Sequence, residues 1–135
     1  MNNFLSFFLV VFLMLGAVGC ANLSEQQQQK SYEEQKALYA DIISQYTELL
    51  TAKHSGKELH APDTENMNER ECAIAETLHG IVDVCKDAKS AENLGYGYRD
   101  LDDNGTPELI LLNKDNSIKA IFTVSDDAPI LLEAN

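Results

Sequence analysis

Residues 108–133 read ELILLNKDNSIKAIFTVSDDAPILLE, and this stretch holds three short runs of aliphatic and β-branched residues. The segments KDN and SDD separate the runs with residues that favour turns. We therefore expect strands at about 108–113, 117–124 and 129–133, paired as an antiparallel meander. GYGYRDL, residues 95–101, is a further strand candidate just before them.

Two amphipathic helices are expected before the strands. From about 32 to 53, apolar residues recur at steps of three and four, which places them on one helical face: Leu38, Tyr39, Ile42, Ile43, Tyr46, Leu49 and Leu50. A second helix is expected over about 67–88, with a similar stripe: Cys72, Ala75, Leu78, Val82 and Cys85. The loop 54–66 between them is rich in Gly, Pro, Asp and Asn. The expected fold is α+β, with two N-terminal helices packed on a small antiparallel β-meander in one domain, residues 32–135.

The N-terminal twenty residues, MNNFLSFFLVVFLMLGAVGC, form an apolar run that ends in small residues and Cys20. The run is short for a membrane span, and it resembles a bacterial lipoprotein signal peptide, residues 1–19, with Cys20 as the lipidation site. An uncleaved membrane anchor is the alternative. Both interpretations place the domain outside the cytoplasm, attached to the cell membrane or the outer membrane. The polar, Gln-rich residues 20–31 are expected to form a tether.

The formal charge of the chain is −12, and the signal segment contains no charged residue. The exported domain is therefore strongly acidic. Such a surface argues against a nucleic-acid partner and is compatible with a domain that gathers cations.

A candidate metal site lies in RDLDDNGTPE, where side-chain oxygens alternate around a glycine. With Asp100 as position one, Asp102, Asn104 and Glu108 occupy positions three, five and nine, and Thr106 offers a backbone carbonyl at seven. Calcium takes six to eight oxygen ligands, and Gly105 at position six permits the tight turn. Position twelve is Leu111, so the bidentate Glu of an EF-hand is missing.

A plain turn is the competing interpretation of the same residues. Asn104-Gly105 is a strong hairpin signal, and Asp side chains near turns commonly accept hydrogen bonds from backbone amides without a metal. However, four carboxylates around one turn repel one another, and a cation offsets that repulsion. This charge crowding favours a metal, with Ca²⁺ in a structural role.

The segment YGYRDLDDNGTPELILLN, residues 96–113, resembles the DxDxDG calcium loops found outside EF-hands, as in FG-GAP and VCBS-like β repeats. The wider pattern over residues 94–133 resembles a group of uncharacterised bacterial lipoproteins. The resemblance implies the same five ligands: Asp100, Asp102, Asn104, Thr106 and Glu108. Asp103 stands where the group usually has Gly, and Asn104 occupies a position where it has Asp.

Cys72 and Cys85 remain as a pair once Cys20 is lipidated, and an exported protein invites a disulfide between them. A continuous helix would place their Cα atoms about 20 Å apart, beyond the reach of a disulfide. The apolar stripe continues across Gly80, which favours one helix with two buried thiols; a break at His79-Gly80 would instead permit the bond.

The sequence thus predicts a non-enzymatic lipoprotein of the cell envelope, held to the membrane through Cys20, with a structural calcium loop and an unknown protein or envelope partner. The alternative is a small exported thiol or hydrolase-like enzyme that uses Cys72 and His79, or the acidic loop.

Overall fold

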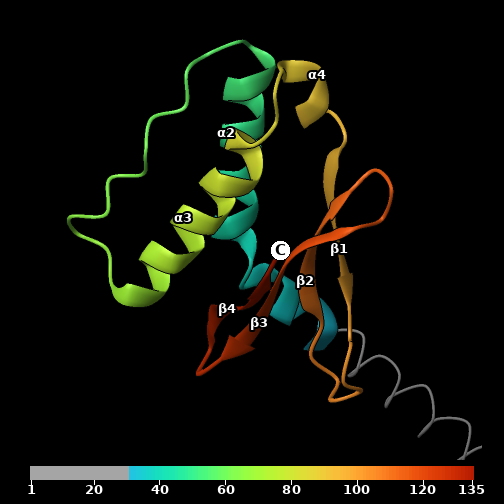
Figure 1. Cartoon of the computed structure of the whole chain (residues 1–135). Coiled ribbons are helices and arrows are strands. Elements are labelled where there is room, and N and C mark those ends of the chain that lie inside the picture. Colours follow the sequence, from blue (N-terminus) through green and yellow to red (C-terminus); the bar gives the residue numbers. More distant parts are fainter. Residues whose placement is uncertain (1–30) are drawn as a thin grey trace, which may run out of the picture. The chain divides into compact units, whose positions relative to one another are not determined.

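A computed structural model describes residues 31–135 of the chain (Figure 1). The chain divides into two compact units, Met1–Glu34 and Gln35–Asn135. Residues 31–34 of the first unit are helical. The predicted signal peptide 1–19, the lipidation site Cys20 and all but the last residue of the predicted tether 20–31 lie outside the described residues.

The first predicted helix, 32–53, is interrupted. Residues 31–37 are helical, Leu38 and Tyr39 form a turn, and α2 begins afresh at Ala40–His54. The backbone amides of Leu38 and Tyr39 donate to carbonyls three residues back, which tightens the chain as in a 3₁₀ turn. The turn accompanies the burial of Tyr39, which is 0% exposed and bonds to the sheet through its hydroxyl.

The second predicted helix is shorter than expected. Helix α3 spans Glu69–Asp83 and begins with a capping box between Asn68 and Glu71. It ends five residues before the predicted boundary, and a separate one-turn helix, α4, spans Ala88–Ala91. The apolar stripe stops at Val82, whereas Val84 is 76% exposed. Asp87 then accepts the backbone amide of Ser90, so the chain restarts a helix there.

Four strands form one antiparallel sheet in the order β1-β2-β3-β4. They are β1 Leu94–Arg99, β2 Glu108–Asn113, β3 Ile118–Ser125 and β4 Ala128–Ala134. The three predicted strands are confirmed to within one residue at each end, and the candidate GYGYRDL supplies β1. The expected α+β class is confirmed, with the correction that, within residues 31–135, three separate helices and the helical residues 31–37 replace the two long helices expected.

Helices α2 and α3 pack side by side against the sheet (Figure 1). Alternate residues of β2 and β3, namely Leu109, Leu111, Ala120 and Phe122, are fully buried against them. The helices contribute Ile42, Tyr46, Leu78 and Val82 to the same core. This packing fixes β2, and with it the position of the acidic loop that leads into β2.

Candidate metal centre

The acidic loop, residues 100–108, connects β1 to β2. The pair Arg99 and Glu108 closes the ladder at its base. Inside the loop, Asp103 has φ 58° and Gly105 has φ 85°. Glycine adopts this left-handed region without strain and aspartate tolerates it better than most residues, so the chain can turn tightly at both positions.

The side chains of the loop turn inward onto its own backbone. Asp100 accepts the amide of Asn104 at 3.1 Å and that of Gly105 at 2.7 Å, one on each carboxylate oxygen. Asp102 accepts the Asn104 amide at 3.2 Å and its side-chain Nδ2 at 2.9 Å. The Oδ1 atom of Asn104 in turn accepts the amide of Thr106 at 2.7 Å. These bonds hold the side chains of Asp100, Asp102 and Asn104 against the backbone of the loop.

Glu108 is the most buried acid of the loop, with 3% of its surface exposed. Its Oε2 accepts the backbone amide of Leu101 at 2.8 Å, and its Oε1 accepts the hydroxyl of Thr123 at 3.0 Å. One side chain therefore ties the loop, β2 and β3 together. Burying a carboxylate is costly unless its oxygens are bonded or neutralised by a cation.

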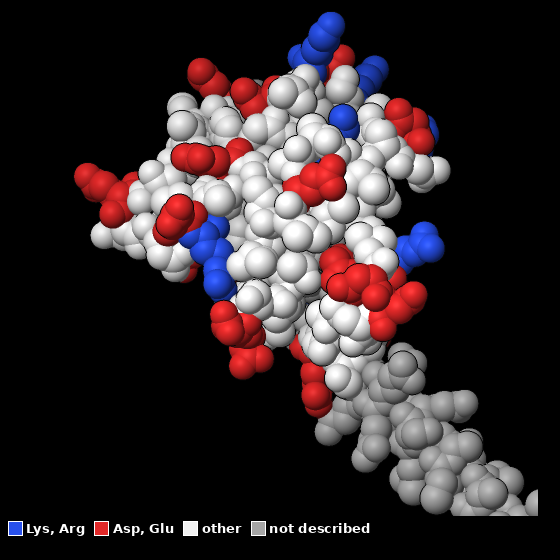
Figure 2. Space-filling view, turned by 60° about the horizontal axis from the view of Figure 1, so that its bottom comes forward, with Lys and Arg blue, Asp and Glu red and all other residues white. Residues whose placement is uncertain are grey.

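Three carboxylates converge within the loop. One oxygen each from Asp100, Asp102 and Glu108 lies within 4.8 Å of the others, a spacing that allows them to share a metal ion. Among the described residues, this is the one group of three or more such side chains with that geometry. Ligation by Asn104 and Thr106 stays a prediction. On the face drawn in Figure 2, acidic side chains are more widespread than basic ones, in line with the net charge of −12, so the overall potential also favours a cation.

Tyr39 supports the loop from the core. Its hydroxyl lies 2.9 Å from the carbonyl of Pro107 and 3.2 Å from that of Phe122. Burial raises the pKa of this phenol above its ordinary value, and the negative charge of Glu108 raises it further. The neutral phenol therefore stays a donor beside the carboxylate. Sequence reasoning placed Tyr39 on an apolar helical face and did not identify it, or Thr123, as a partner of the site.

Cys72 and Cys85 are free, so the possible disulfide is not formed. Both are half-buried; Cys72 lies on α3, and Cys85 follows its end. Burial raises the pKa of the Cys85 thiol, which opposes its ionisation to a nucleophile.

Among the described residues, no hydrogen bond joins the sulfur of Cys72 to Nε2 of His79. The two residues are two turns apart on α3, or about 10 Å along its axis. The Nε2 atom of His79 is buried with no hydrogen-bond partner among the described residues. The sulfur of Cys72 instead lies 3.7 Å from the carbonyl of Met67.

Comparison of the chain with protein-family models, curated proteins and solved structures found no match. Within residues 31–135, none of the helices has the length and apolar character required to cross a membrane.

Proposed function

We propose that this chain is a lipid-anchored protein of the cell envelope whose domain is a non-enzymatic binding module stabilised by one calcium ion in the acidic loop. The anchor is expected at Cys20, from the lipoprotein-like segment that precedes it. The observation that carries the calcium assignment is the convergence of Asp100 and Asp102 on the buried carboxylate of Glu108.

Charge and ligand chemistry support calcium in particular. Three carboxylates with oxygens within 4.8 Å of one another repel, and a cation offsets that repulsion. The side chains that meet there offer only oxygen atoms as metal ligands. Calcium accepts such an irregular oxygen set, whereas magnesium demands near-ideal octahedral geometry. Asn104 in place of an aspartate leaves one charge fewer, and we expect a dissociation constant of roughly 10⁻⁴ to 10⁻³ M, as for extracellular modules.

The ion would have a structural role. Because Glu108 already joins the loop to β3 through Thr123, an ion shared with Asp100 and Asp102 would fix the end of β1 to the start of β2. In this role calcium raises the free energy of unfolding and takes no part in a reaction.

Thermal melting of the purified protein with Ca²⁺ and with a chelator tests the proposal. Saturating calcium is expected to stabilise the fold by about 2 kcal/mol, which raises the Tm of a domain of this size by roughly 10 °C. Asp100→Ala and Asp102→Ala should each abolish the shift. An equal Tm in calcium and in chelator would refute the site.

Asp103 provides the matched control, because it lies in the same loop but outside the converging group. Since Asp103 has a positive φ, Asp103→Asn is a better control than Asp103→Ala: asparagine tolerates the left-handed conformation. This variant removes the same charge and should keep most of the calcium shift. If Asp103→Asn alone removes the shift, the assigned ligand positions are wrong.

A further inference from the structure

A groove lies between α2, the start of α3 and the start of β4, and no residue of the acidic loop lines it. We name it the α2–α3 groove; its volume is about 690 Å³. Its apolar lining comes from Ile42, Met67, Ile74 and Pro129, and its polar lining includes Asp41, Gln45, Arg70 and Glu71. A volume of this size lies within the usual range of ligand-binding sites.

The floor of the groove is apolar. Ile42 is 2% exposed and Ile74 is 7% exposed, so both side chains belong to the packed interior. Pro129 lies at the β4 end, and Met67 forms an apolar rim that is 37% exposed. An aliphatic side chain placed here would bury its surface against these residues without disturbing the core.

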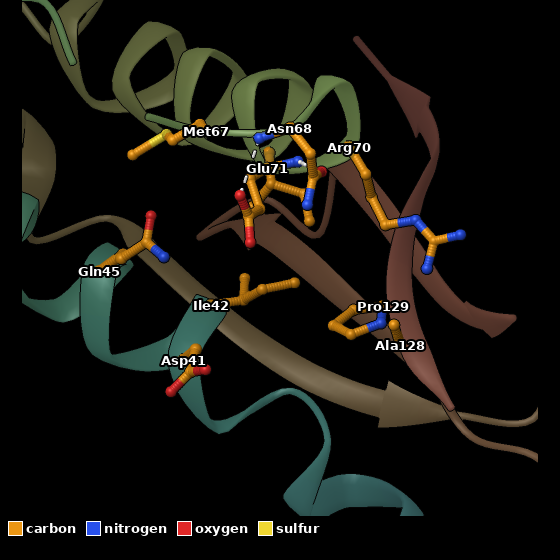
Figure 3. A pocket seen from close by; sticks show the side chains of 10 residues that line it. Asp41, Ile42, Gln45, Met67, Asn68, Arg70, Glu71, Ala128 and Pro129 are labelled. Atoms are coloured by element: carbon orange, nitrogen blue, oxygen red, sulfur yellow. Dashed lines mark hydrogen bonds between the residues drawn. The ribbon is translucent and has the colours of Figure 1, made fainter. Parts of the chain in front are cut away.

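The walls of the groove carry negative charge and hydrogen-bonding groups. Glu71 on α3 and Gln45 on α2 extend toward the space between the two helices (Figure 3). One oxygen of Glu71 accepts the amide of Asn68 in the capping box. Asp41 adds a second exposed carboxylate at the α2 rim.

Arg70 is the one basic side chain among the lining residues, and it does not neutralise Glu71. Its guanidinium extends away from Glu71 (Figure 3) and donates to the carbonyl of Ser125 at 3.3 Å. The space between α2 and α3 therefore presents the Glu71 carboxylate, with Asp41 at the rim, while Arg70 of the lining is turned toward Ser125. A ligand that brings its own positive charge complements this arrangement.

The groove continues along the molecule. A second hollow of about 500 Å³ shares Asn68 and Arg70 with the first and follows β4 at Ile130 and Leu131. Two adjoining open hollows fit an extended chain better than one compact small molecule. A second copy of this protein is a poor occupant, because a chain of net charge −12 would bring more acid to the carboxylates.

We propose that the α2–α3 groove binds an extended cationic peptide segment of a partner protein, in which a Lys or Arg lies next to an aliphatic residue. The aliphatic side chain occupies the floor at Ile42 and Ile74, and the cation meets Glu71 and the Gln45 amide, with Asp41 adding attraction at the rim. This inference rests on the binding-module part of the proposed function and is independent of its calcium site.

Fluorescence anisotropy of a labelled peptide of alternating Lys and Leu, added to the purified protein, tests the proposal. We expect saturable binding that weakens as salt rises. Two further peptides, with Glu in place of Lys or Gly in place of Leu, should each bind at least about tenfold more weakly. Equal binding of the acidic peptide, or full competition by free spermidine, would overturn the assignment.

Variants locate the binding on the protein. Glu71→Gln combined with Asp41→Asn should weaken binding about tenfold, and glutamine retains the acceptor that the capping box requires. Glu76→Gln is the control for the loss of an acid on α3, because Glu76 is an exposed acid of that helix outside the groove. Circular dichroism should show that all three proteins remain folded. Unchanged affinity in the double variant, or an equal loss in Glu76→Gln, would overturn the site.

The same titration in chelator separates this proposal from the calcium proposal. Binding is expected at temperatures where the calcium-free protein remains folded, even if the loop binds no ion. Loss of peptide binding on chelation while the fold persists would contradict the independence of the two sites.

Discussion

Two turns of the sheet contain neighbouring aspartates, yet they use them differently. Between β3 and β4, Asp126 and Asp127 form a two-residue turn with φ 54° and 57°, closed by the pair Ser125 and Ala128. Both side chains are exposed. The carboxylate of Asp126 accepts a long, weak hydrogen bond from the hydroxyl of Ser125, at 3.5 Å. Aspartate serves here as a residue that tolerates left-handed backbone.

In the acidic loop only Asp103 has that backbone role, while Asp100 and Asp102 turn their oxygens inward. The decisive difference is Glu108, which closes the loop from a buried position and has no counterpart at the β3–β4 turn. Adjacent aspartates thus indicate a turn, and alternate acids that end at a buried glutamate indicate a candidate cation site.

The largest effect is expected from Glu108→Ala. The change leaves the Leu101 amide and the Thr123 hydroxyl without their acceptor and lowers the free energy of unfolding by about 3 kcal/mol. Chemical denaturation measures the loss, and the calcium response should vanish with it. Glu133→Ala, an exposed acid of β4, is the control and should change stability little. A small loss of stability for Glu108→Ala would mean that the buried glutamate does not distinguish the acidic loop from the β3–β4 turn.

Charge removal at the two turns gives the next largest contrast. Asp100→Asn should remove a calcium-dependent stabilisation of about 2 kcal/mol. Asp127→Asn removes one charge at the other turn and should leave the calcium response intact. Melting curves with calcium and with chelator compare the two variants directly. Equal losses in both would show that calcium screens the acidic surface and does not occupy the loop.

Alkaline pH should lower the free energy of unfolding, because it ionises buried tyrosines such as Tyr39, whose hydroxyl donates to the Pro107 carbonyl of the acidic loop. Burial raises the pKa of Tyr39 above 10, and that of Tyr46 to about 12. A raised folded pKa means that the stability gained from the neutral phenol is fully present below pH 10 and is lost as the pH rises from 10 toward 12. Denaturation between pH 9 and about pH 12 should record this loss.

Tyr39→Phe tests which phenol matters to the loop. It removes the hydrogen bonds to the carbonyls of Pro107 and Phe122, should cost about 1 to 2 kcal/mol, and should weaken calcium binding. Tyr46→Phe is the control, because the Tyr46 hydroxyl is buried with no partner among the described residues. Its loss should be neutral or stabilising. A larger loss for Tyr46→Phe than for Tyr39→Phe would contradict the support role.

The smallest effect is expected from changing Asp126 and Asp127, which occupy left-handed backbone positions. Replacing Asp126-Asp127 with Asn-Gly, which suits two consecutive left-handed residues, should stabilise the protein by about 0.5 kcal/mol and leave calcium binding unchanged. The same replacement of Asp102-Asp103 should reduce the calcium response. Isothermal titration with Ca²⁺ separates the two. A reduced calcium affinity in the β3–β4 variant would contradict the distinction between the turns.

Much of the sheet could be predicted from the sequence, because each strand carries its own β-prone run and its own turn residues. The helix boundaries were harder, since the apolar spacing runs through the break at Leu38 and Tyr39. That break accompanies bonds from Tyr39 to the sheet, which no local pattern records. Similarly, Cys85 continued the stripe in the sequence although α3 ends at Asp83.

The candidate metal site was predictable in part. Alternation around Gly105 identified Asp100, Asp102 and Glu108, which the fold brings together. The burial of Glu108 and its bond to Thr123 depend on the pairing of β2 with β3, so a local motif does not reveal them. The α2–α3 groove was not anticipated either, because its residues come from three separate elements.

The bonds of Tyr39 also bear on how the domain folds. In a meander every strand pairs with its neighbour along the chain, so each hairpin closes a short loop and can form early. Tyr39, in contrast, bonds to residues 68 and 83 positions away. Because such distant contacts must overcome a larger loop-closure entropy, the docking of this tyrosine should be among the last events of folding. The hydrogen bonds of its hydroxyl would then form in the step that joins separately formed hairpins and helices into one cooperative unit.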